Sequence, residues 1–346
     1  MGQKQANIAR RHHIIPHFLL KRFAQDDRVW VLNRAQNRSY RTNINNVIEV
    51  DYYRVETNGE IGEDYVEQKI LGSMIEDKAS PIIDNMLSSR KLPQGDDWNV
   101  MANFLAVMYT RGPTLRKLIK LLHQFCSEVI EDHIHSDERT WKVTIEQVSR
   151  ETGIEVDMDY EQALHARESF EINVEIPRTH YVVQMLQVAT ILVAVFAEMT
   201  PNLEIVEVMS GAEYVISDCP IVPVPKSLNP SDGWRWYKNP NADLFFPLSS
   251  EACLILNYDK RRKVTTVNKK RAALINHLMA CNSQRAIISK KQDFVWRREN
   301  GTTCSSHEEL LEFLEHIPCG PAETDLPKES LRKDILKTLE EHPQSE

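Results

Sequence analysis

The sequence of 346 residues has no uninterrupted apolar run of the roughly 18 residues that a membrane-spanning helix requires. Its longest apolar stretch, 182–196, is interrupted by Gln184, Gln187 and Thr190, which predicts a buried helix of a protein core. The basic N-terminus is not followed by an apolar segment of signal-peptide type. We therefore expect a cytoplasmic protein that makes no contact with a membrane.

Several familiar motifs are also missing. The six cysteines form no C-x-x-C pair, which argues against a zinc knuckle or a thioredoxin-like site. The patterns G-x-x-x-x-G-K-[ST], G-x-G-x-x-G, H-E-x-x-H and G-x-S-x-G are absent, which argues against ordinary P-loop, dinucleotide-binding, zincin and α/β-hydrolase chemistry. The sequence predicts no metal site and leaves any cofactor unknown.

Positive charge is scarce in the whole chain but concentrated at its start. The formal net charge is −8, which argues against a wholly basic nucleic-acid binder. Residues 1–54 nevertheless carry ten basic side chains against four acidic ones, the basic ones being Lys4, Arg10, Arg11, Lys21, Arg22, Arg28, Arg34, Arg38, Arg41 and Arg54. This region could attract nucleic acid or a nucleotide, and a solvated basic face explains the same residues.

The pattern of elements predicts an α+β fold. Strands are expected at 28–33 and 39–42, and a helix at 63–90 should break or kink at Pro81. Further helices are expected at 98–110 and 179–199, and a hairpin of 203–209 with 213–216 around Ser210-Gly211. Because the middle is helical and both ends contribute strands, the N-terminal and C-terminal strands could share one mostly antiparallel sheet.

This order of elements also predicts a division of the chain. Residues 1–300 should form a single composite domain, with a basic motif and strands in 1–62, helices in 63–200 and a β-rich part in 201–300. Residues 301–346 are expected to form a C-terminal helical extension, with 320–346 separable from the main fold. The C-terminal helices could pair in a homo-oligomer.

Four short motifs follow one another in a recognisable order. They are His13-Ile14-Ile15-Pro16 with Leu20 and Phe23, Arg111-Gly112-Pro113 with Arg116, Ser217-Asp218-Cys219-Pro220, and Pro247-Leu248-Ser249. Over about residues 12–290 they resemble a bacterial family known as domain of unknown function 4238, which opens on H-x-x-P-x-x-x-L-x-x-F. Two positions depart from the family pattern: Ile14 stands where an aromatic residue is common, and Gly112 where Thr or Ser is common. The resemblance implies a fold but no established chemistry.

His13 and Asp218 are the candidate catalytic residues. A neutral imidazole at the entrance of a buried segment can act as a base, a phosphate donor or a metal ligand, and it can equally serve as a cap. Asp218 follows a strand and precedes a proline-stiffened loop, where functional side chains are often mounted, although an Asx turn would use the same residue. We predict that the two side chains lie in one neighbourhood.

Arg22 and Arg111 are the candidate phosphate-binding residues. Arg111 stands at a helix break, from which its guanidinium could reach phosphate or carboxylate. The alternative for Arg111 is a structural bridge to Glu67 or Glu76.

These residues suggest two hypotheses about function. In the first, the protein is a bacterial effector, in defence or as a toxin, that binds or cleaves a phosphate-bearing ligand as a nuclease or phosphodiesterase-type hydrolase. In the second, it is a non-catalytic interaction protein in which the same residues hold the first and last thirds of the chain together.

Overall fold

The computed structural model describes residues 11–47, 49–50, 53, 55, 65–169, 174–225, 241–320 and 326–341. The chain divides into two compact units. The first combines Met1–Arg116 with Pro177–Gly320, and the second combines Lys117–Ile176 with Pro321–Glu346. These boundaries differ from the predicted ones, because residues 301–320 belong to the first unit and residues 117–176 leave the expected helical segment.

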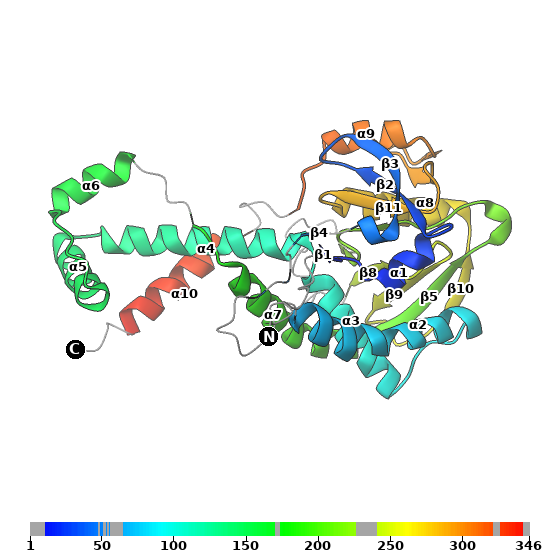
Figure 1. Ribbon diagram of the computed structural model, residues 1–346, viewed down its shortest axis with the longest axis horizontal. Helices are drawn as coiled ribbons and strands as arrows, with labels where there is room; N and C mark the ends of the chain where they lie inside the picture. Colours follow the sequence, from blue (N-terminus) through cyan, green and yellow to red (C-terminus); the bar gives the residue numbers. More distant parts are fainter. Residues whose placement is uncertain are drawn as a thin grey trace, which may run out of the picture. The chain divides into compact units, whose positions relative to one another are not determined.

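The first unit contains two larger sheets (Figure 1). One has the strand order β10-β5-β9-β8-β7, with β10 parallel to β5 and the other neighbours antiparallel. Its strands are β5 (Thr200–Val206), β7 (Val222–Pro225), β8 (Ala242–Pro247), β9 (Ala252–Asn257) and β10 (Val264–Val267). The other sheet is antiparallel with the order β3-β2-β11-β6, formed by β2 (Arg28–Asn33), β3 (Arg38–Asn43), β6 (Ile216–Ser217) and β11 (Ala286–Ser289).

Strands from both ends of the chain share the second sheet. Val31 of β2 lies opposite Ile288 of β11, and β11 pairs on its other edge with β6. Two short ladders accompany the sheets: β1 (Arg11–His12) with β4 (Glu49–Val50), and β12 (Trp296–Arg297) with β13 (Thr303–Cys304). The prediction of an α+β fold in which N-terminal and C-terminal strands share a sheet is confirmed.

The predicted hairpin around Ser210-Gly211 is wrong. The turn itself forms, with Gly211 at φ 64° after the 3₁₀ helix η4 (Val208–Ser210), but β5 and β6 enter different sheets. Tyr214 and Val215 are buried, and the Val215 N–H donates to Asn276 Oδ1 at 3.0 Å. Burial of these two side chains draws the chain into the core instead of back along β5.

Helices pack on both sides of the five-stranded sheet. The α-helices among the described residues of the first unit include α1 (His17–Leu20), α2 (Asp77–Ser89), α3 (Asp96–Thr110), α7 (Arg178–Glu198), α8 (Lys269–Asn282) and α9 (His307–Glu315), and its 3₁₀ helices include η1 (Lys21–Phe23) and η2 (Ile44–Asn46) besides η4. Ile275 of α8 belongs to one buried cluster with Ile255 of β9 and Ile287 of β11, so α8 joins the two sheets. On the other face, the Phe104 ring of α3 lies 6.0 Å from the ring of Phe246 in β8.

The predicted buried helix is α7, and one of its faces is buried. Its buried residues include Val182, Met185 and Phe196, and the Trp98 indole of α3 donates to the Ala197 carbonyl at 3.0 Å. The opposite face is open to solvent, with Ile191 69% exposed. Among the described helices, α7 is the one whose length and composition alone would allow it to cross a membrane.

The helix predicted at 63–90 changes from a π-helix to an α-helix a few residues before Pro81. Residues Val66–Glu76 form a π-helix, η3, which passes directly into α2 at Asp77. Proline has no N–H, so the Asp77 carbonyl cannot receive the usual bond from residue 81, and the two windings meet at this point.

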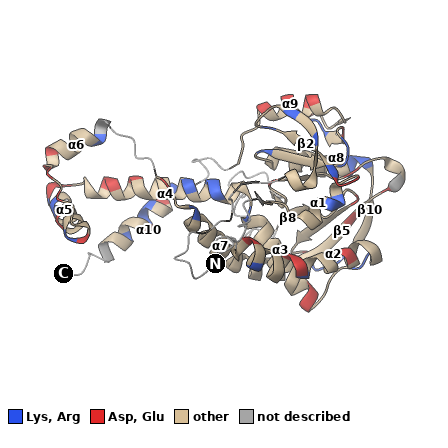
Figure 2. Cartoon of the chain, in the orientation of Figure 1, with Lys and Arg blue, Asp and Glu red and all other residues tan. Residues whose placement is uncertain are grey.

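The second unit is helical. It contains most of α4 (Pro113–Ile134), with α5 (Glu138–Thr152), α6 (Tyr160–Ser169) and α10 (Lys328–Glu341). Basic residues lie in the N-terminal half of α4 and acidic residues in its C-terminal half (Figure 2). Arg332 of α10 pairs with Asp132 in the acidic half at 2.9 Å, and the Lys328 ammonium lies 5.5 Å from the centre of the Phe125 ring. Helix α10 therefore packs on α4, and residues 321–325, within the segment predicted to be separable, lie outside the described residues.

Candidate functional site

Arg111 is the centre of a buried polar network. It follows α3 and is 1% exposed. Its Nη1 donates to Glu76 Oε1 at 2.6 Å, its Nε donates to the Tyr53 hydroxyl at 3.1 Å, and its Nη2 donates to the His13 carbonyl. The Tyr53 hydroxyl in turn donates to the Arg111 carbonyl at 3.2 Å. The guanidinium is thus tied to three separate chain segments, and one of these ties is the bridge to Glu76 that the sequence offered as an alternative.

The π-helix explains why two glutamates face Arg111. Glu67 and Glu76 lie nine residues apart on η3, and in an α-helix that spacing would turn them about half a turn away from each other. The i→i+5 bonds of a π-helix widen the turn to about 4.4 residues, so two turns return to the same face. The spacing of Glu67 and Glu76 therefore fits one face of η3.

Burial dominates the electrostatics of this network. It raises the pKa of Tyr53 to about 12, although the Arg111 charge opposes the rise. Burial also raises the pKa of Glu67, again against the attraction of Arg111. Burial disfavours the charge of Arg111 itself, but Tyr53 and Glu76 outweigh it and leave its pKa raised. Arg111 therefore stays charged, and its guanidinium interacts with Glu76, Tyr53 and the His13 carbonyl within the protein.

The two histidines of the first motif face different partners. His12 is fully buried, and its Nδ1 accepts from the Tyr53 N–H at 2.7 Å. His13 is half-buried, its ring lies edge-on to His17 at 6.0 Å, and its N–H donates to Glu67 Oε1 at 3.5 Å. Sequence reasoning missed His12 and Tyr53, because their hydrogen bond joins residues 41 positions apart and follows from no local pattern.

Asp218 holds the beginning of β11. Its Oδ1 accepts from the Gln284 N–H at 3.0 Å and its Oδ2 from the Arg285 N–H at 2.8 Å, while its own N–H donates to the Ala286 carbonyl at 3.1 Å. The residue is 5% exposed, and burial raises the pKa of its carboxyl from 3.8 to about 6, against these backbone hydrogen bonds. Burial and the backbone hydrogen bonds therefore act in opposite directions on the charge of this carboxyl.

The second motif packs directly against the third. A Cβ at Gly112 would stand 2.9 Å from the Asp218 carbonyl oxygen, so this chain has no room for the larger residue common in the family. Thr114 Oγ1 lies 3.0 Å from Cys219 Sγ and accepts from Gln284 Nε2 at 2.8 Å. Burial raises the pKa of Cys219, which keeps it a thiol and argues against a nucleophilic role.

Arg22 contacts Phe18 and Asp84 and takes no part in the hydrogen bonds described above for Arg111 and Asp218. Its Nη1 donates to the Phe18 carbonyl at 2.6 Å and its Nη2 pairs with Asp84 of α2 at 2.5 Å. The guanidinium also lies 5.1 Å from the centre of the Phe18 ring. Arg22 thus joins α1 to α2 and is not brought together with the other three candidates by any of these contacts.

Arg34, from the basic N-terminal region, is also used internally, whereas Lys21, Arg28, Arg38 and Arg41 are exposed. The Arg34 Nη1 donates to the Ser283 carbonyl at 2.7 Å and its Nη2 to the Leu314 carbonyl at 2.8 Å, at the ends of α8 and α9. The predicted contributions of Lys4, Arg10 and Arg54 and of the Arg11 side chain lie outside the described residues.

A pocket of about 310 Å³ opens beside Asp218. Ile14 and Ile15, the two residues after His13, line it together with Asp218, so the first and third motifs meet there. Its other polar lining residues are Asn33, Gln36, Tyr40, Asn46 and Arg285. Of the four candidate site residues, Asp218 is the one that lines the pocket. Arg285 was missed because its place follows from the pairing of β11 with β2, which no local pattern reveals.

Comparison with known proteins supports the resemblance found in the motifs. The model of the family described as protein of unknown function (DUF4238) matches residues 11–293, which include the motifs around His13, Arg111 and Asp218. No curated protein and no solved structure matches the chain. The chain therefore belongs to the DUF4238 family.

Proposed function

We propose that the pocket beside Asp218 binds a phosphate-bearing ligand, either a nucleotide or one nucleotide of a nucleic acid, and that the protein hydrolyses a phosphodiester there. The observation that supports this is that Asp218 and Arg285 line the same pocket, where burial raises the pKa of the Asp218 carboxyl to about 6. Catalytic sites are where such perturbed carboxyls concentrate.

In this proposal the Asp218 carboxyl transfers a proton and the Arg285 guanidinium binds the phosphate. A carboxyl that is partly protonated near neutral pH can give or take a proton as general acid or base. The two backbone N–H groups that bind Asp218 at 3.0 and 2.8 Å hold its orientation fixed. Arg285 offers a planar fork of donors that matches the oxygens of a phosphate.

The rest of the lining suits a nucleotide. Asn33, Gln36 and Asn46 carry amides, which both donate and accept hydrogen bonds, and Tyr40 adds a ring and a hydroxyl. The volume of about 310 Å³ lies near the lower end of the range of about 300–1,000 Å³ that small-molecule sites occupy. These properties favour one nucleotide over a broad duplex surface.

Three of the predicted residues take revised places in this proposal. His13, adjacent to the lining residue Ile14, is the candidate second proton-transfer group. We assign the phosphate contact to Arg285, which lines the pocket, in place of Arg22 and Arg111, which are not among its lining residues. A nuclease or phosphodiesterase acting in the bacterial cytoplasm, in defence or as a toxin, remains part of the proposal.

A cleavage assay tests the proposal. Labelled single-stranded and duplex RNA and DNA, with Mg²⁺ or Mn²⁺ supplied, would be incubated with the full chain and separated on denaturing gels. Arg285→Gln keeps the backbone N–H that holds Asp218 and removes the charge, so kcat/KM should fall at least tenfold, the equivalent of about 1.4 kcal/mol. Arg28→Gln, which removes an exposed charge outside the pocket lining, should leave kcat/KM unchanged.

The outcomes separate the proposal from simple misfolding. Asp218→Asn and His13→Gln should abolish cleavage while the circular dichroism of the folded chain is kept. Cleavage that survives both Asp218→Asn and Arg285→Gln, or the absence of cleavage of every substrate, would overturn the hydrolase proposal.

A specific observation also favours the second candidate, a non-catalytic interaction protein. Asp218 and Arg111 both connect distant segments of the chain, Asp218 to the start of β11 and Arg111 to Tyr53, Glu76 and His13. If this is their whole role, Arg285→Gln should change nothing measurable, and Arg111→Lys should lower stability.

A further inference from the structure

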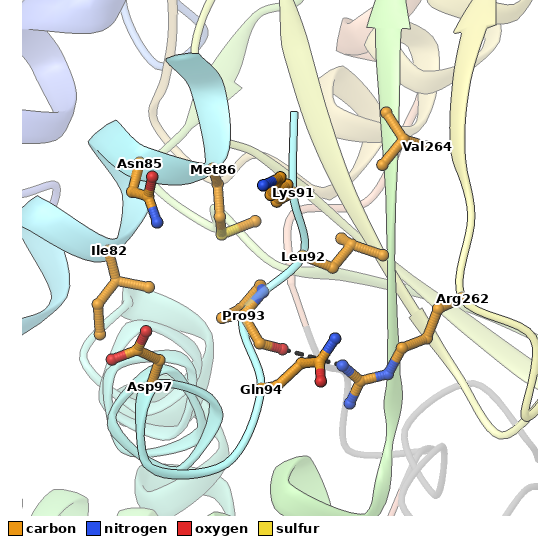
Figure 3. Close-up of a pocket in the computed structure, with 10 residues that line it drawn as sticks. All are labelled: Ile82, Asn85, Met86, Lys91, Leu92, Pro93, Gln94, Asp97, Arg262 and Val264. Atoms are coloured by element: carbon orange, nitrogen blue, oxygen red, sulfur yellow. Dashed lines mark hydrogen bonds between the residues drawn. The ribbon is translucent and has the colours of Figure 1, made fainter. Parts of the chain in front are cut away.

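A second groove, of about 440 Å³, lies between the α2–α3 connection and β10 (Figure 3). Its apolar lining comes from Ile82 and Met86 of α2, Leu92 of the connection and Val264 of β10. Arg262, just before β10, spans the groove and its Nη1 donates to the Pro93 carbonyl at 3.0 Å. The groove is therefore built from two chain segments fixed to each other.

The groove adjoins the outermost strand of the five-stranded sheet. The Leu203 N–H donates to the Lys263 carbonyl at 2.9 Å and the Glu207 N–H to the Val267 carbonyl at 3.0 Å, so these residues face β5. Because backbone groups alternate sides along a strand, Val264 and Thr266 direct their N–H and C=O groups to the outer edge. No strand of the described residues pairs with that edge.

The basic residues of the groove lining are Lys91 and Arg262. Lys260, Arg261 and Lys263 flank Arg262 in the turn before β10. Asp259, beside Arg261, and Asp97, in the groove lining, offset part of this charge. The local potential is therefore positive and attracts acidic side chains.

We propose that this edge and groove bind an acidic, extended segment of a partner protein. The segment adds a strand to β10 through Val264 and Thr266, places one apolar side chain on Ile82 and Met86, and sets acidic side chains against Lys91 and the turn at 260–263. This is the arrangement in which main-chain bonds supply affinity and a side-chain pocket supplies selectivity.

Two other roles for this surface, protection against aggregation and binding of nucleic acid, would each leave part of it unexplained. A basic turn beside a short edge strand protects against aggregation, but that protection requires no apolar groove. A single-stranded nucleic acid would match the charge, yet sequence-tolerant strand binding relies on aromatic rings for stacking, and none of the residues lining the groove is aromatic. An acidic peptide with an apolar side chain uses the charge, the groove and the strand edge together.

Selection of binding peptides gives the test. A displayed library of random twelve-residue peptides would be selected on the full-length chain, and the affinity of enriched peptides measured by fluorescence anisotropy. Enriched sequences should alternate apolar and acidic residues. Lys91→Glu and Thr266→Pro should each weaken binding at least tenfold, whereas Lys120→Glu and Thr266→Val, the matched controls, should change it less than twofold.

N-methylation of the peptide provides a readout that does not depend on the fold of a variant. Methyl groups on alternate peptide nitrogens should abolish binding with a period of two, as strand addition requires. Failure to enrich acidic–apolar peptides, binding insensitive to Lys91→Glu, or a flat methylation scan would overturn the proposal. So would binding of a twelve-residue oligothymidylate through Lys91 in place of the peptide.

Discussion

The pH dependence of stability should reveal the state of Asp218. Burial raises the pKa of its carboxyl from 3.8 to about 6. Between pH 3.8 and pH 6 the carboxyl is mostly ionised in the unfolded chain and mostly protonated in the folded chain. The folded chain therefore binds more protons, and its stability falls as the pH rises. The contribution is fully present below about pH 4 and is lost as pH passes 6.

The size of the effect follows from the shift. A difference of about two pKa units, at 1.36 kcal/mol each, gives about 3 kcal/mol. Asp218→Asn cannot titrate, and its amide lowers stability by a nearly constant amount because it turns a donor toward one of the backbone N–H groups of Gln284 and Arg285. The free energy of unfolding of the native chain minus that of the variant should therefore fall, between pH 4 and pH 7, by most of the amount that the pKa shift gives.

Urea unfolding followed by tryptophan fluorescence at pH 4, 5, 6 and 7 would measure this difference. Asp26→Asn, at an exposed position on the turn before β2, is the matched control and should give a flat difference. A difference between the native chain and Asp218→Asn that grows with pH would show that the backbone N–H groups outweigh burial. Asp218 would then be a carboxylate at neutral pH, which would refute its role as a general acid.

Three further substitutions or deletions test the fold around the site. Arg111→Lys keeps a charge but loses the fork that joins three partners, so the free energy of unfolding should fall by about 3 kcal/mol in urea titrations; an unchanged midpoint would mean that the network contributes little. Gly112→Ala places a methyl group 2.9 Å from the Asp218 carbonyl oxygen and should lower the free energy of unfolding by about 1–3 kcal/mol in the same assay; an unchanged midpoint would count against a tight contact between the two motifs. Truncation after Gly320 removes α10 and should speed hydrogen exchange in α4 while the urea midpoint of the first unit stays constant; a fall in that midpoint would count against the division into units.

Local patterns predicted several elements correctly. The run RVWVLN forms β2, and the apolar segment 98–110 lies within α3, which begins at Asp96. The shared sheet could be predicted because strands at both ends of the chain need partners. The hairpin at Ser210-Gly211 could not, since the burial of Tyr214 and Val215 depends on α8, which lies some sixty residues further along the chain.

The candidate site was predictable in part. The motifs identified Arg111 and Asp218 as polar residues of importance, and both proved to be buried and hydrogen-bonded. Their partners were harder to foresee, because Glu67 and Glu76 share a face only in a π-helix. Arg285 reaches the pocket through the register of β11, a long-range property that no single segment encodes.

Calorimetric titration with nucleotides is the most direct test of the pocket beside Asp218. Each of the four ribonucleoside 5′-monophosphates and its parent nucleoside would be titrated into the native chain and into Arg285→Gln at low salt. At least one monophosphate should bind the native chain tenfold or more tightly than its nucleoside, and Arg285→Gln should bring the two affinities together. Equal affinities for monophosphate and nucleoside in the native chain, or a preference for the monophosphate that survives Arg285→Gln, would contradict a phosphate site in this pocket.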